Sequence, residues 1–280
     1  MKKSLSNGIL ILVFLTGLSL LLYPTVSNYW NSVHQSRAIA SYAEAVEDLN
    51  ANAYKDMLQD TMQYNEKLFH AENRFLMSEA DRKTYDSLLN ITGNGAMGYI
   101  KIPTIACELP IYHGIQDTVL QIAVGHIEGT SLPVGGESTH CVLSGHRGLP
   151  SAKLFSDLDQ VKEGDLFMIY VLDEVLTYEI DQIRIVLPEK VDDLDIEKGK
   201  DLCTLVTCTP YGINSHRLLV RGHRVENIDG LDFYVQADAL QVDPTIVASV
   251  FAVPILVLLL IWLLVPRRKR MHQYNRDRRK

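Results

Sequence analysis

The sequence has little cysteine, and its cysteines do not fall at the spacings that bind metal. Four occur in 280 residues, at positions 107, 141, 203 and 208. Four are too few for a disulfide-stapled scaffold, and a folded region of about 140 residues buries a sufficient core without such bonds. The sequence contains neither C-x-x-C nor H-E-x-x-H, and its acidic stretches lack EF-hand spacing. We therefore expect no metal site and no bound cofactor.

Signals for phosphate or nucleic-acid binding are also missing. No glycine-rich turn leads from a strand into a helix, and "GHRG" and "VGGES" are weak phosphate-binding signals. The net charge is −7, and the basic residues are concentrated at Lys2–Lys3 and in 266–280. The intervening 27–245 is therefore strongly acidic, which argues against a nucleic-acid partner.

Long apolar runs, in contrast, occur near both ends of the chain. Residues 8–26 and 246–265 are each long enough to cross a hydrocarbon core as a helix, which takes roughly 20 residues. The second run predicts a transmembrane helix. The first is either an uncleaved anchor, favoured by its length and by the lack of a small-x-small cleavage site, or a cleaved signal peptide.

The basic residues beside these runs predict an orientation in the cell membrane. Lys2–Lys3 precede the first run and Arg267–Arg270 follow the second. By the positive-inside rule, both termini are cytoplasmic if the first run is uncleaved, and 27–245 is extracellular.

The region between the apolar runs changes once from a helical pattern to strand patterns. Residues 28–70 have helical spacing without glycine or proline, and "ITGNGAMG" then marks a boundary. Short strand patterns follow, including a hairpin turning at Asp173–Glu174, and such a series favours a closed or nearly closed β-barrel. The expected organisation is an anchor or signal at 1–26, a helical stalk at 27–94, a β-rich domain at 95–229, a linker at 230–245, a transmembrane helix at 246–265 and a basic tail at 266–280.

Cys208 is the candidate for chemistry in this β-rich domain. It ends a strand pattern in "TLVTCTPYGINSHRLLVRG", and it is either a buried apolar residue or a nucleophile. A thiol nucleophile needs a proton carrier, and His146 in "CVLSGHRGLPSA" lies at the expected barrel rim. Arg217 follows Cys208 across one loop, and its charge can hold a carbonyl oxygen that becomes negative. Taken alone, a rim histidine and a strand arginine are more often structural.

The other residues near this loop fit packing roles. Cys203 lies five positions before Cys208, so strand alternation turns it to the opposite face. Cys107 and Cys141 lie in strand-like runs and fit the core. His216 alternates with Arg217, so the two cannot share a face.

The segments "TLVTCTPYGINSHRLLVRG" and "LSGHRGLPSAKLF" resemble the signature segments of the sortases. More narrowly, the chain resembles the class C, pilus-assembling sortases of Gram-positive bacteria, over roughly Gly95 to Arg224. "MGYIKIPTIACELPIYHG", "YEIDQIRIVLP" and the C-terminal apolar run support this resemblance. It implies a mainly β fold, a closed eight-stranded barrel with an N-terminal helical segment and flanking transmembrane helices.

The resemblance also implies an activity. A cysteine transpeptidase of this kind cleaves an LPxTG-like sorting signal between Thr and Gly and joins pilin subunits through lysine isopeptide bonds. Cys208 is then the nucleophile, His146 the general acid and base, and Arg217 the group that stabilises the oxyanion or holds the substrate. The expected substrate groove includes Thr207, Thr209, Pro210 and Tyr211.

One segment departs from the class C pattern. These enzymes usually carry an Asp-Pro-aromatic lid motif before the barrel, whereas this chain has Asn73, Arg74 and Phe75 in that position. The aromatic residue is retained, but the acidic residue and the proline are not. We expect a weakly held lid here, and the alternative is a plain linker between stalk and barrel.

Two other functions stay open from the sequence. The first is a sortase that anchors proteins to the cell wall through a peptidoglycan-precursor amine. The second is a non-catalytic, membrane-tethered scaffold. The expected partners of the pilus-assembling enzyme are pilin subunits with LPxTG-like signals and acceptor lysines, together with the membrane.

Overall fold

The computed structural model describes residues 2–227, 252–258 and 260–261. The chain divides into two compact units, one of Met1–Val26 with Leu240–Lys280 and the other of Ser27–Ala239. The expected linker at 230–245 and basic tail at 266–280 lie outside the described residues. So does most of the expected transmembrane helix at 246–265, of which 252–258 and 260–261 are described and are helical.

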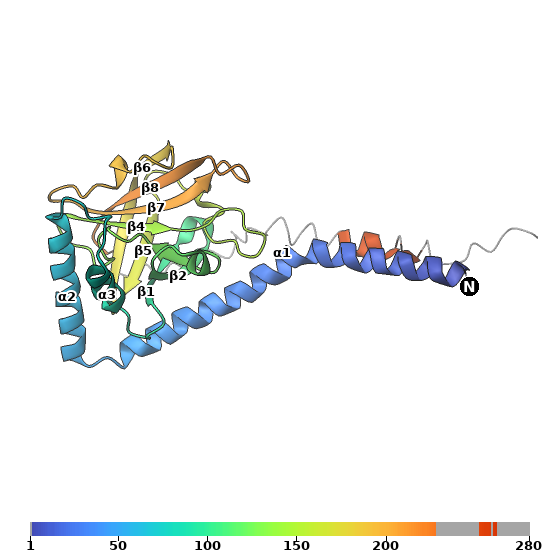
Figure 1. The fold of residues 1–280 in the computed structure, drawn as a ribbon, viewed down its shortest axis with the longest axis horizontal. Coiled ribbons are helices and arrows are strands. Elements are labelled where there is room, and N and C mark those ends of the chain that lie inside the picture. The colour runs from blue at the N-terminus through green and yellow to red at the C-terminus, as the bar shows by residue number, and fades with distance from the viewer. Residues whose placement is uncertain (1, 228–251, 259, 262–280) are drawn as a thin grey trace, which may run out of the picture. The chain divides into compact units, whose positions relative to one another are not determined.

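The second unit is built on a closed barrel of eight strands (Figure 1). Its order is β1-β2-β3-β4-β7-β8-β6-β5, and the pairs β2–β3 and β4–β7 are parallel. The strands are β1 (Ala96–Ile102), β2 (Cys107–His113), β3 (Val124–His126), β4 (Thr139–Ser144), β5 (Leu166–Val171), β6 (Glu174–Val186), β7 (Asp201–Thr209) and β8 (His216–Arg224). The mainly β, closed eight-stranded barrel is therefore confirmed.

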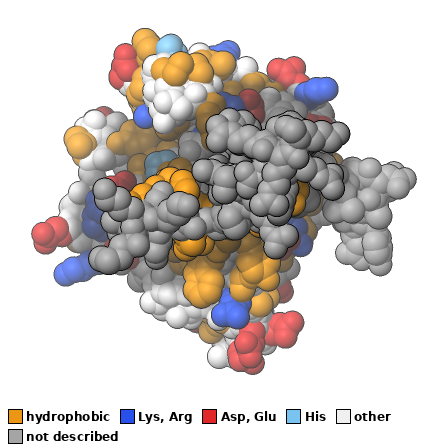
Figure 2. Space-filling model, turned by 90° about the vertical axis from the view of Figure 1, so that its right-hand side faces the viewer, with side chains coloured by type: hydrophobic (Ala, Val, Ile, Leu, Met, Phe, Trp, Pro, Cys, Tyr) orange, Lys and Arg blue, Asp and Glu red, His pale blue; other side chains and the backbone are white. Residues whose placement is uncertain are grey.

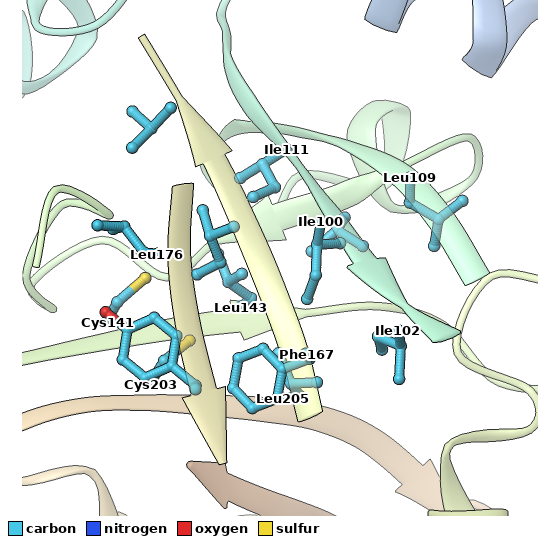
Figure 3. Packing of buried hydrophobic residues seen from close by; sticks show 14 of the residues in the cluster. Ile100, Ile102, Leu109, Ile111, Cys141, Leu143, Phe167, Leu176, Cys203 and Leu205 are labelled. Carbon is cyan, nitrogen blue, oxygen red and sulfur yellow. The ribbon is translucent and has the colours of Figure 1, made fainter. Parts of the chain in front are cut away.

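The inside of the barrel is filled by apolar side chains from every second strand position (Figure 3). On β7, Cys203 and Leu205 point inward, and Cys203 lies directly beside Cys141 of β4 in the parallel register. Burial raises the pKa of the Cys203 thiol well above its ordinary value. Burial also raises the pKa of Cys107 to about 12. Both thiols are therefore uncharged at neutral pH, as expected of packing residues.

The helices before the barrel are α1 (Lys2–Glu47), α2 (Ala51–Phe69) and α3 (Glu79–Ser87). The continuous helical pattern expected over 28–70 is interrupted at 48–50. Asn50 accepts hydrogen bonds from the backbone N–H groups of Asn52 (3.2 Å) and Ala53 (2.9 Å). Its side chain thus competes with helix continuation and caps a new helix.

The helical segment packs on the barrel rather than standing away from it as a solvated stalk. The buried Tyr42 of α1 donates to the carbonyl of Met97 (3.0 Å) and accepts from the N–H of Leu172 (2.8 Å). Asn65 of α2 makes two hydrogen bonds with the backbone of Leu132, at 2.8 and 3.0 Å. Both α2 and α3 lie against the same side of the barrel (Figure 1), so 27–94 and the barrel form one compact unit.

The N-terminal part of α1 is apolar and exposed. Among the described residues, the helix over Gly8–Glu47 is long and apolar enough to cross a membrane, by length and composition. Ile9, Leu12, Val13 and Leu20 are among its exposed side chains. On the face drawn in Figure 2, hydrophobic side chains are exposed among the described residues.

Four short helical turns complete the fold. They are η1 (Pro103–Ile105), α4 (Asp117–Leu120), η2 (Leu158–Gln160) and η3 (Asp192–Leu194). Of these, η3 in the β6–β7 loop and η2 after β4 lie near the residues discussed next.

Candidate active site

Cys208 and Arg217 lie on the outer face of the barrel as direct cross-strand neighbours. Antiparallel pairing of β7 and β8 sets Cys208 opposite Arg217. Cys208 is half-buried, whereas Cys203 and Leu205 on the same strand fill the core. Side chains opposite one another on such a pair have Cβ atoms about 4.5–5.5 Å apart. The register therefore sets both residues on the same face of the sheet.

His146 reaches the same place from β4. The parallel register pairs Ser144 with Val206, and the N–H of Gly145 donates to the carbonyl of Val206 at 3.0 Å. Because the parallel register runs from Ser144 towards Cys208, we expect His146 to lie close to Cys208. The carbonyl of His146 accepts from the N–H of Phe155 (3.1 Å), which closes the loop after β4. The half-buried His146 thus follows the end of β4 by two residues.

The guanidinium of Arg217 also shapes the β7–β8 loop. Its Nη1 donates to the carbonyls of Asn214 (3.3 Å) and His216 (3.1 Å). Asn214 has a φ of 59° and Gly212 a φ of 74°, which lets the loop turn back sharply between the two strands. The charge of Arg217 is therefore held at the end of the hairpin, on the Cys208 side of β8.

A buried apolar cluster lies on the strand face that carries Cys208. It consists of Val142, Leu194, Val206 and Leu219, with Ile127 and Val186 packed against them. Val206 lies two positions before Cys208 on β7, and Leu219 two positions after Arg217 on β8. Leu194 belongs to η3, so the β6–β7 loop packs on this cluster.

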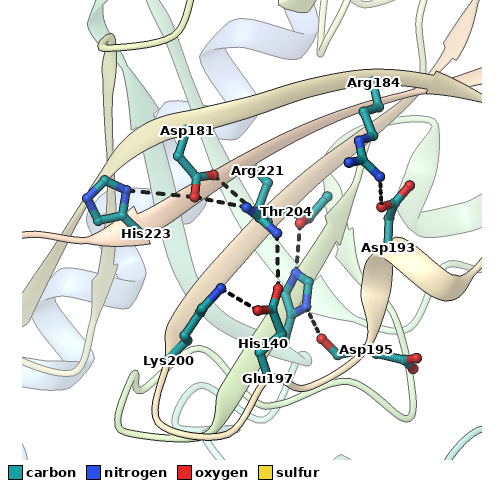
Figure 4. A network of polar contacts seen from close by, with 10 residues as sticks. All are labelled: His140, Asp181, Arg184, Asp193, Asp195, Glu197, Lys200, Thr204, Arg221 and His223. Carbon is teal, nitrogen blue, oxygen red and sulfur yellow. Dashed lines mark hydrogen bonds and ion pairs between the residues drawn. The ribbon is translucent and has the colours of Figure 1, made fainter.

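A polar network fixes the β6–β7 loop to the sheet (Figure 4). The buried His140 of β4 donates from Nδ1 to the carbonyl of Asp195 (2.8 Å), because a carbonyl can only accept. Its Nε2 accepts from the Thr204 hydroxyl (2.7 Å). Arg221 of β8 binds both carboxylate oxygens of Asp181 at 3.0 Å and Glu197 at 3.1 Å.

The four expected groove residues divide into two pairs. Pro210 and Tyr211 are exposed at the start of the β7–β8 loop and can line a groove. Thr207 and Thr209 are only 2% and 7% exposed. They alternate with Cys208 and point away from the outer face. Their hydroxyls bond the loop after β4 instead, so these two side chains do not share the face of Cys208.

Contacts of the two threonines were not predicted from the sequence. The Thr207 hydroxyl donates to the carbonyl of Gly145 (2.7 Å), and Arg147 Nη1 donates to the Thr209 hydroxyl (3.2 Å). Arg147 is also paired with Asp159. The available signal was the alternation in "TCT", which turns both threonines to the face opposite Cys208.

The expected lid segment lies between the β6–β7 loop and the loop after β3. The Arg74 guanidinium donates to the carbonyl of Leu194 (3.0 Å) and to Asp195 Oδ1 (2.8 Å), and lies 4.8 Å from the Phe75 ring centroid. A Cβ on Gly129 would come within 2.6 Å of the Arg74 carbonyl. The segment is therefore in close contact with the barrel, and its anchor is Arg74 rather than Asn73.

Over the part of the chain that the structure describes, no group of three or more His, Cys, Asp and Glu side chains is arranged to hold a metal ion.

Residues 100–225 match the family described as the sortase domain. Sortase C1 from Streptococcus agalactiae is 52% identical to this chain, with a TM-score of 0.66 over 69% of this chain and 100% of that one. A sortase C structure from Clostridium perfringens with the C-terminal cell wall sorting motif is 41% identical, with a TM-score of 0.60 over 69% and 100% of the two chains.

Sortase A from S. agalactiae is 37% identical over 118 residues, which are 40% of this chain and 47% of that protein. The match thus spans about half the length of this relative. In contrast, the match to the two sortase C structures covers the whole of each solved chain. The chain therefore belongs to the sortase family of cysteine transpeptidases, and its structural neighbours include class C sortases.

Proposed function

We propose that this protein is a transpeptidase that cleaves an LPxTG-like sorting signal between Thr and Gly and joins pilin subunits through lysine isopeptide bonds. The observation that carries the proposal is the register of three strands. It makes Cys208 and Arg217 cross-strand neighbours. The parallel pairing of β4 with β7 runs towards Cys208 and ends two residues before His146, so we expect His146 beside Cys208. A thiol, an imidazole and a fixed positive charge at one point suit acyl transfer.

In the first half-reaction, His146 takes the proton of the Cys208 thiol, and the thiolate Sγ attacks the carbonyl carbon of the signal threonine. The carbonyl oxygen becomes an oxyanion, and Arg217 stabilises its charge. The C–N bond to glycine then breaks, and His146 gives a proton to the leaving amine. The product is a thioacyl-enzyme in which the threonine carbonyl is bonded to Cys208.

In the second half-reaction, a lysine side-chain amine of another pilin attacks the thioester carbonyl. His146 accepts a proton from the attacking nitrogen, the C–S bond breaks and the Cys208 thiolate leaves. An isopeptide bond links the two subunits, and the enzyme returns to its starting state. The exposed Pro210 and Tyr211 at the start of the β7–β8 loop suit contact with the apolar part of the signal.

The acceptor distinguishes this function from its alternative, a sortase that anchors proteins to the cell wall. The sortase C relatives include one from Streptococcus pneumoniae that is described with pilin substrate specificity, which favours a pilin acceptor. The similarity to sortase A keeps the wall-anchoring alternative open. Greater identity and fuller coverage of the sortase C structures favour pilin polymerisation. We further infer an extracellular catalytic domain held at the cell membrane by the apolar part of α1 and by 246–265.

The segment Asn73–Phe75 acts as a lid in this proposal. Arg74 binds the β6–β7 loop through Leu194 and Asp195, and Leu194 packs with Val206, two positions before Cys208. A lid so anchored restricts access to the groove. Its release opens the groove in which the sorting signal binds.

An LPxTG-type peptide tests the chemistry. The ectodomain is incubated with the peptide, and mass spectrometry measures the mass of the protein. We expect an adduct equal to the peptide up to its threonine, on Cys208. Cys208→Ala should form none, while the matched control Cys203→Ala should form it normally. Adduct on another cysteine, or none in the native protein with a range of such peptides, would contradict the proposal.

Acceptor choice is tested with two amines on the same thioacyl-enzyme. One is a peptide that carries a lysine side chain, and the other is a peptidoglycan-type amino peptide. Faster release by the lysine peptide supports pilin polymerisation. Faster release by the wall-type amine supports the alternative.

A further inference from the structure

We propose that Thr207 and Arg147 form a two-point clamp that holds His146 at Cys208 and so positions both groups for catalysis. This inference rests on the proposed function, in which the two residues act together. The clamp consists of two hydrogen bonds on either side of the pair. Thr207 bonds Gly145, and Arg147 bonds Thr209.

The first hydrogen bond of the clamp joins the residues that come just before Cys208 and His146 in the sequence. Thr207 comes immediately before Cys208, and Gly145 immediately before His146. The Thr207 hydroxyl donates to the Gly145 carbonyl at 2.7 Å, and the side chain is 2% exposed. This bond extends the parallel ladder beyond Ser144, where β4 ends. It therefore fixes the position of the loop after β4 along the direction of β7.

The second point of the clamp follows both residues. Thr209 comes immediately after Cys208, and Arg147 immediately after His146. Arg147 Nη1 donates to the Thr209 hydroxyl at 3.2 Å, while Nη2 is paired with Asp159. The Arg147 side chain is 9% exposed. The carboxylate of Asp159 compensates its largely buried charge, and a planar guanidinium can bond both partners at once.

Packing leaves the loop little freedom between these two points. A Cβ on Gly145 would lie 2.6 Å from the Phe155 ring, so the backbone is pressed against that ring. Gly148 has a φ of 77°, and its N–H donates to the Ser156 hydroxyl at 3.1 Å. The backbone on either side of His146 is thus held, and the imidazole is carried by a segment tied to β7 before and after Cys208.

Strand alternation explains why threonines suit the two flanking positions. Thr207 and Thr209 point to the face opposite Cys208, so their hydroxyls can bind the loop without occupying the groove. A displacement of about 1 Å in a catalytic group can cost about 100-fold in rate. The clamp therefore affects turnover although neither threonine side chain touches the substrate.

The test uses isosteric pairs, Thr209→Val against Thr209→Ser and Thr207→Val against Thr207→Ser. Valine keeps the shape and removes the hydroxyl, whereas serine keeps the hydroxyl. We expect each valine variant to form the thioacyl-enzyme about 10- to 100-fold more slowly, with KM for the peptide within about twofold. Each serine variant should recover most of the rate. A raised KM with unchanged kcat would instead make the threonines groove residues and overturn the clamp.

The second measurement is the pH dependence of Cys208 alkylation by iodoacetamide, which needs no peptide. We expect the profiles of Thr209→Val and Arg147→Ala to move towards that of His146→Ala. In the His146→Ala background the same changes should have no further effect, because the clamp acts through His146. A merely structural role would lower the urea midpoint and leave the profile in place, which would overturn the inference.

The alkylation profiles distinguish failure of the proposed function from failure of the clamp alone. If His146→Ala leaves the alkylation profile unchanged, the proposed partnership of Cys208 and His146 is wrong. If His146→Ala changes the profile while Arg147→Ala and both valine variants do not, only the clamp is wrong. Unfolding midpoints of all variants are measured so that rates are compared on folded protein.

Discussion

Cys208 and Arg217 stand opposite each other in the antiparallel register of β7 and β8, with both side chains on the outer face of the barrel. The Arg217 guanidinium is also bonded to the carbonyls of Asn214 and His216. These bonds hold a permanent positive charge at the end of the hairpin whose first strand carries the thiol. The charge is in position before substrate binds, and such preorganised electrostatics contribute most where negative charge develops in the transition state.

Replacement of Arg217 should therefore affect chemistry more than binding. We expect Arg217→Ala to slow thioacyl formation by about 10²- to 10³-fold. Arg217→Lys should recover only part of the rate, because an ammonium lacks the planar fork of a guanidinium. Rapid-quench mass spectrometry of the peptide adduct measures the rate. Formation within about threefold of the native rate in Arg217→Ala would rule out an oxyanion role.

The buried thiol of Cys203 should matter for stability and not for activity. Cys203→Ala removes a fully buried sulfur from the core and should lower the free energy of unfolding by about 1–2 kcal/mol. Cys208→Ala, at a half-buried site, should change it less and abolish the adduct. Urea unfolding and adduct formation on the same samples separate the two effects. Loss of the adduct in a folded Cys203→Ala protein would contradict this assignment.

The lid should open when its arginine anchor is removed. Arg74→Ala deletes the bonds to Leu194 and Asp195, and a loss of about 1–2 kcal/mol shifts the closed state about 5- to 30-fold towards open. Labelling of Cys208 by a bulky maleimide should speed up accordingly. Asp195→Asn should have a smaller effect, because Asp195 is largely exposed and its ion pair is screened.

Two further variants show whether the segment covers the thiol at all. Phe75→Ala should speed labelling of Cys208 if the ring shields it. Asn73→Asp introduces the acidic residue of the usual class C lid and should slow labelling if it can reach Arg217. If labelling is the same in Arg74→Ala, Phe75→Ala and the native protein, the segment is a linker and no lid.

Acid should destabilise the fold through His140. Burial is the largest cause that lowers the pKa of His140 below its ordinary value of 6.5, and the nearby Arg221 and Arg74 act in the same direction. A lowered pKa in the folded state gives stability that is present above about pH 6.5 and is lost as pH falls through the folded-state pKa. The urea concentration at the unfolding midpoint should therefore decrease as the pH is lowered below 6.5.

His140→Gln serves as the control for this pH dependence. The amide can donate to the Asp195 carbonyl and does not titrate, so its urea midpoint should change less between pH 7 and pH 5. An equal drop in both proteins would assign the acid sensitivity to other groups.

The sequence predicts secondary structure best where a long local pattern, such as alternating apolar residues, favours one type of element. Alternating apolar residues marked β1, β2 and β4 to β8, but β3 comprises only Val124–His126 and is too short to show a period. The helical pattern of 28–70 did not reveal the interruption at Asn50. Asparagine is tolerated on a helix surface, and only the backbone around it shows that its side chain caps α2.

The candidate active site could be predicted in part. Cys208 and Arg217 are close in sequence, so strand alternation alone sets them on one face. His146 was brought to them by the family resemblance, because the β4–β7 register is a long-range property. The roles of Thr207, Thr209 and Arg74 depend on which elements pack against them, and no local pattern encodes such contacts.

The parallel pairing of β4 with β7 has a consequence for how the protein matures. The hydrogen bond that joins Thr207 to Gly145 closes a loop of 62 residues, and contacts of such separation form late because the entropy of closing the loop must be overcome first. While the chain is unfolded, Cys208 has no imidazole beside it and is an ordinary thiol. A nascent or translocating chain therefore lacks the His146-assisted reactivity of Cys208. The onset of His146-dependent alkylation of Cys208 would report when the barrel closes during folding.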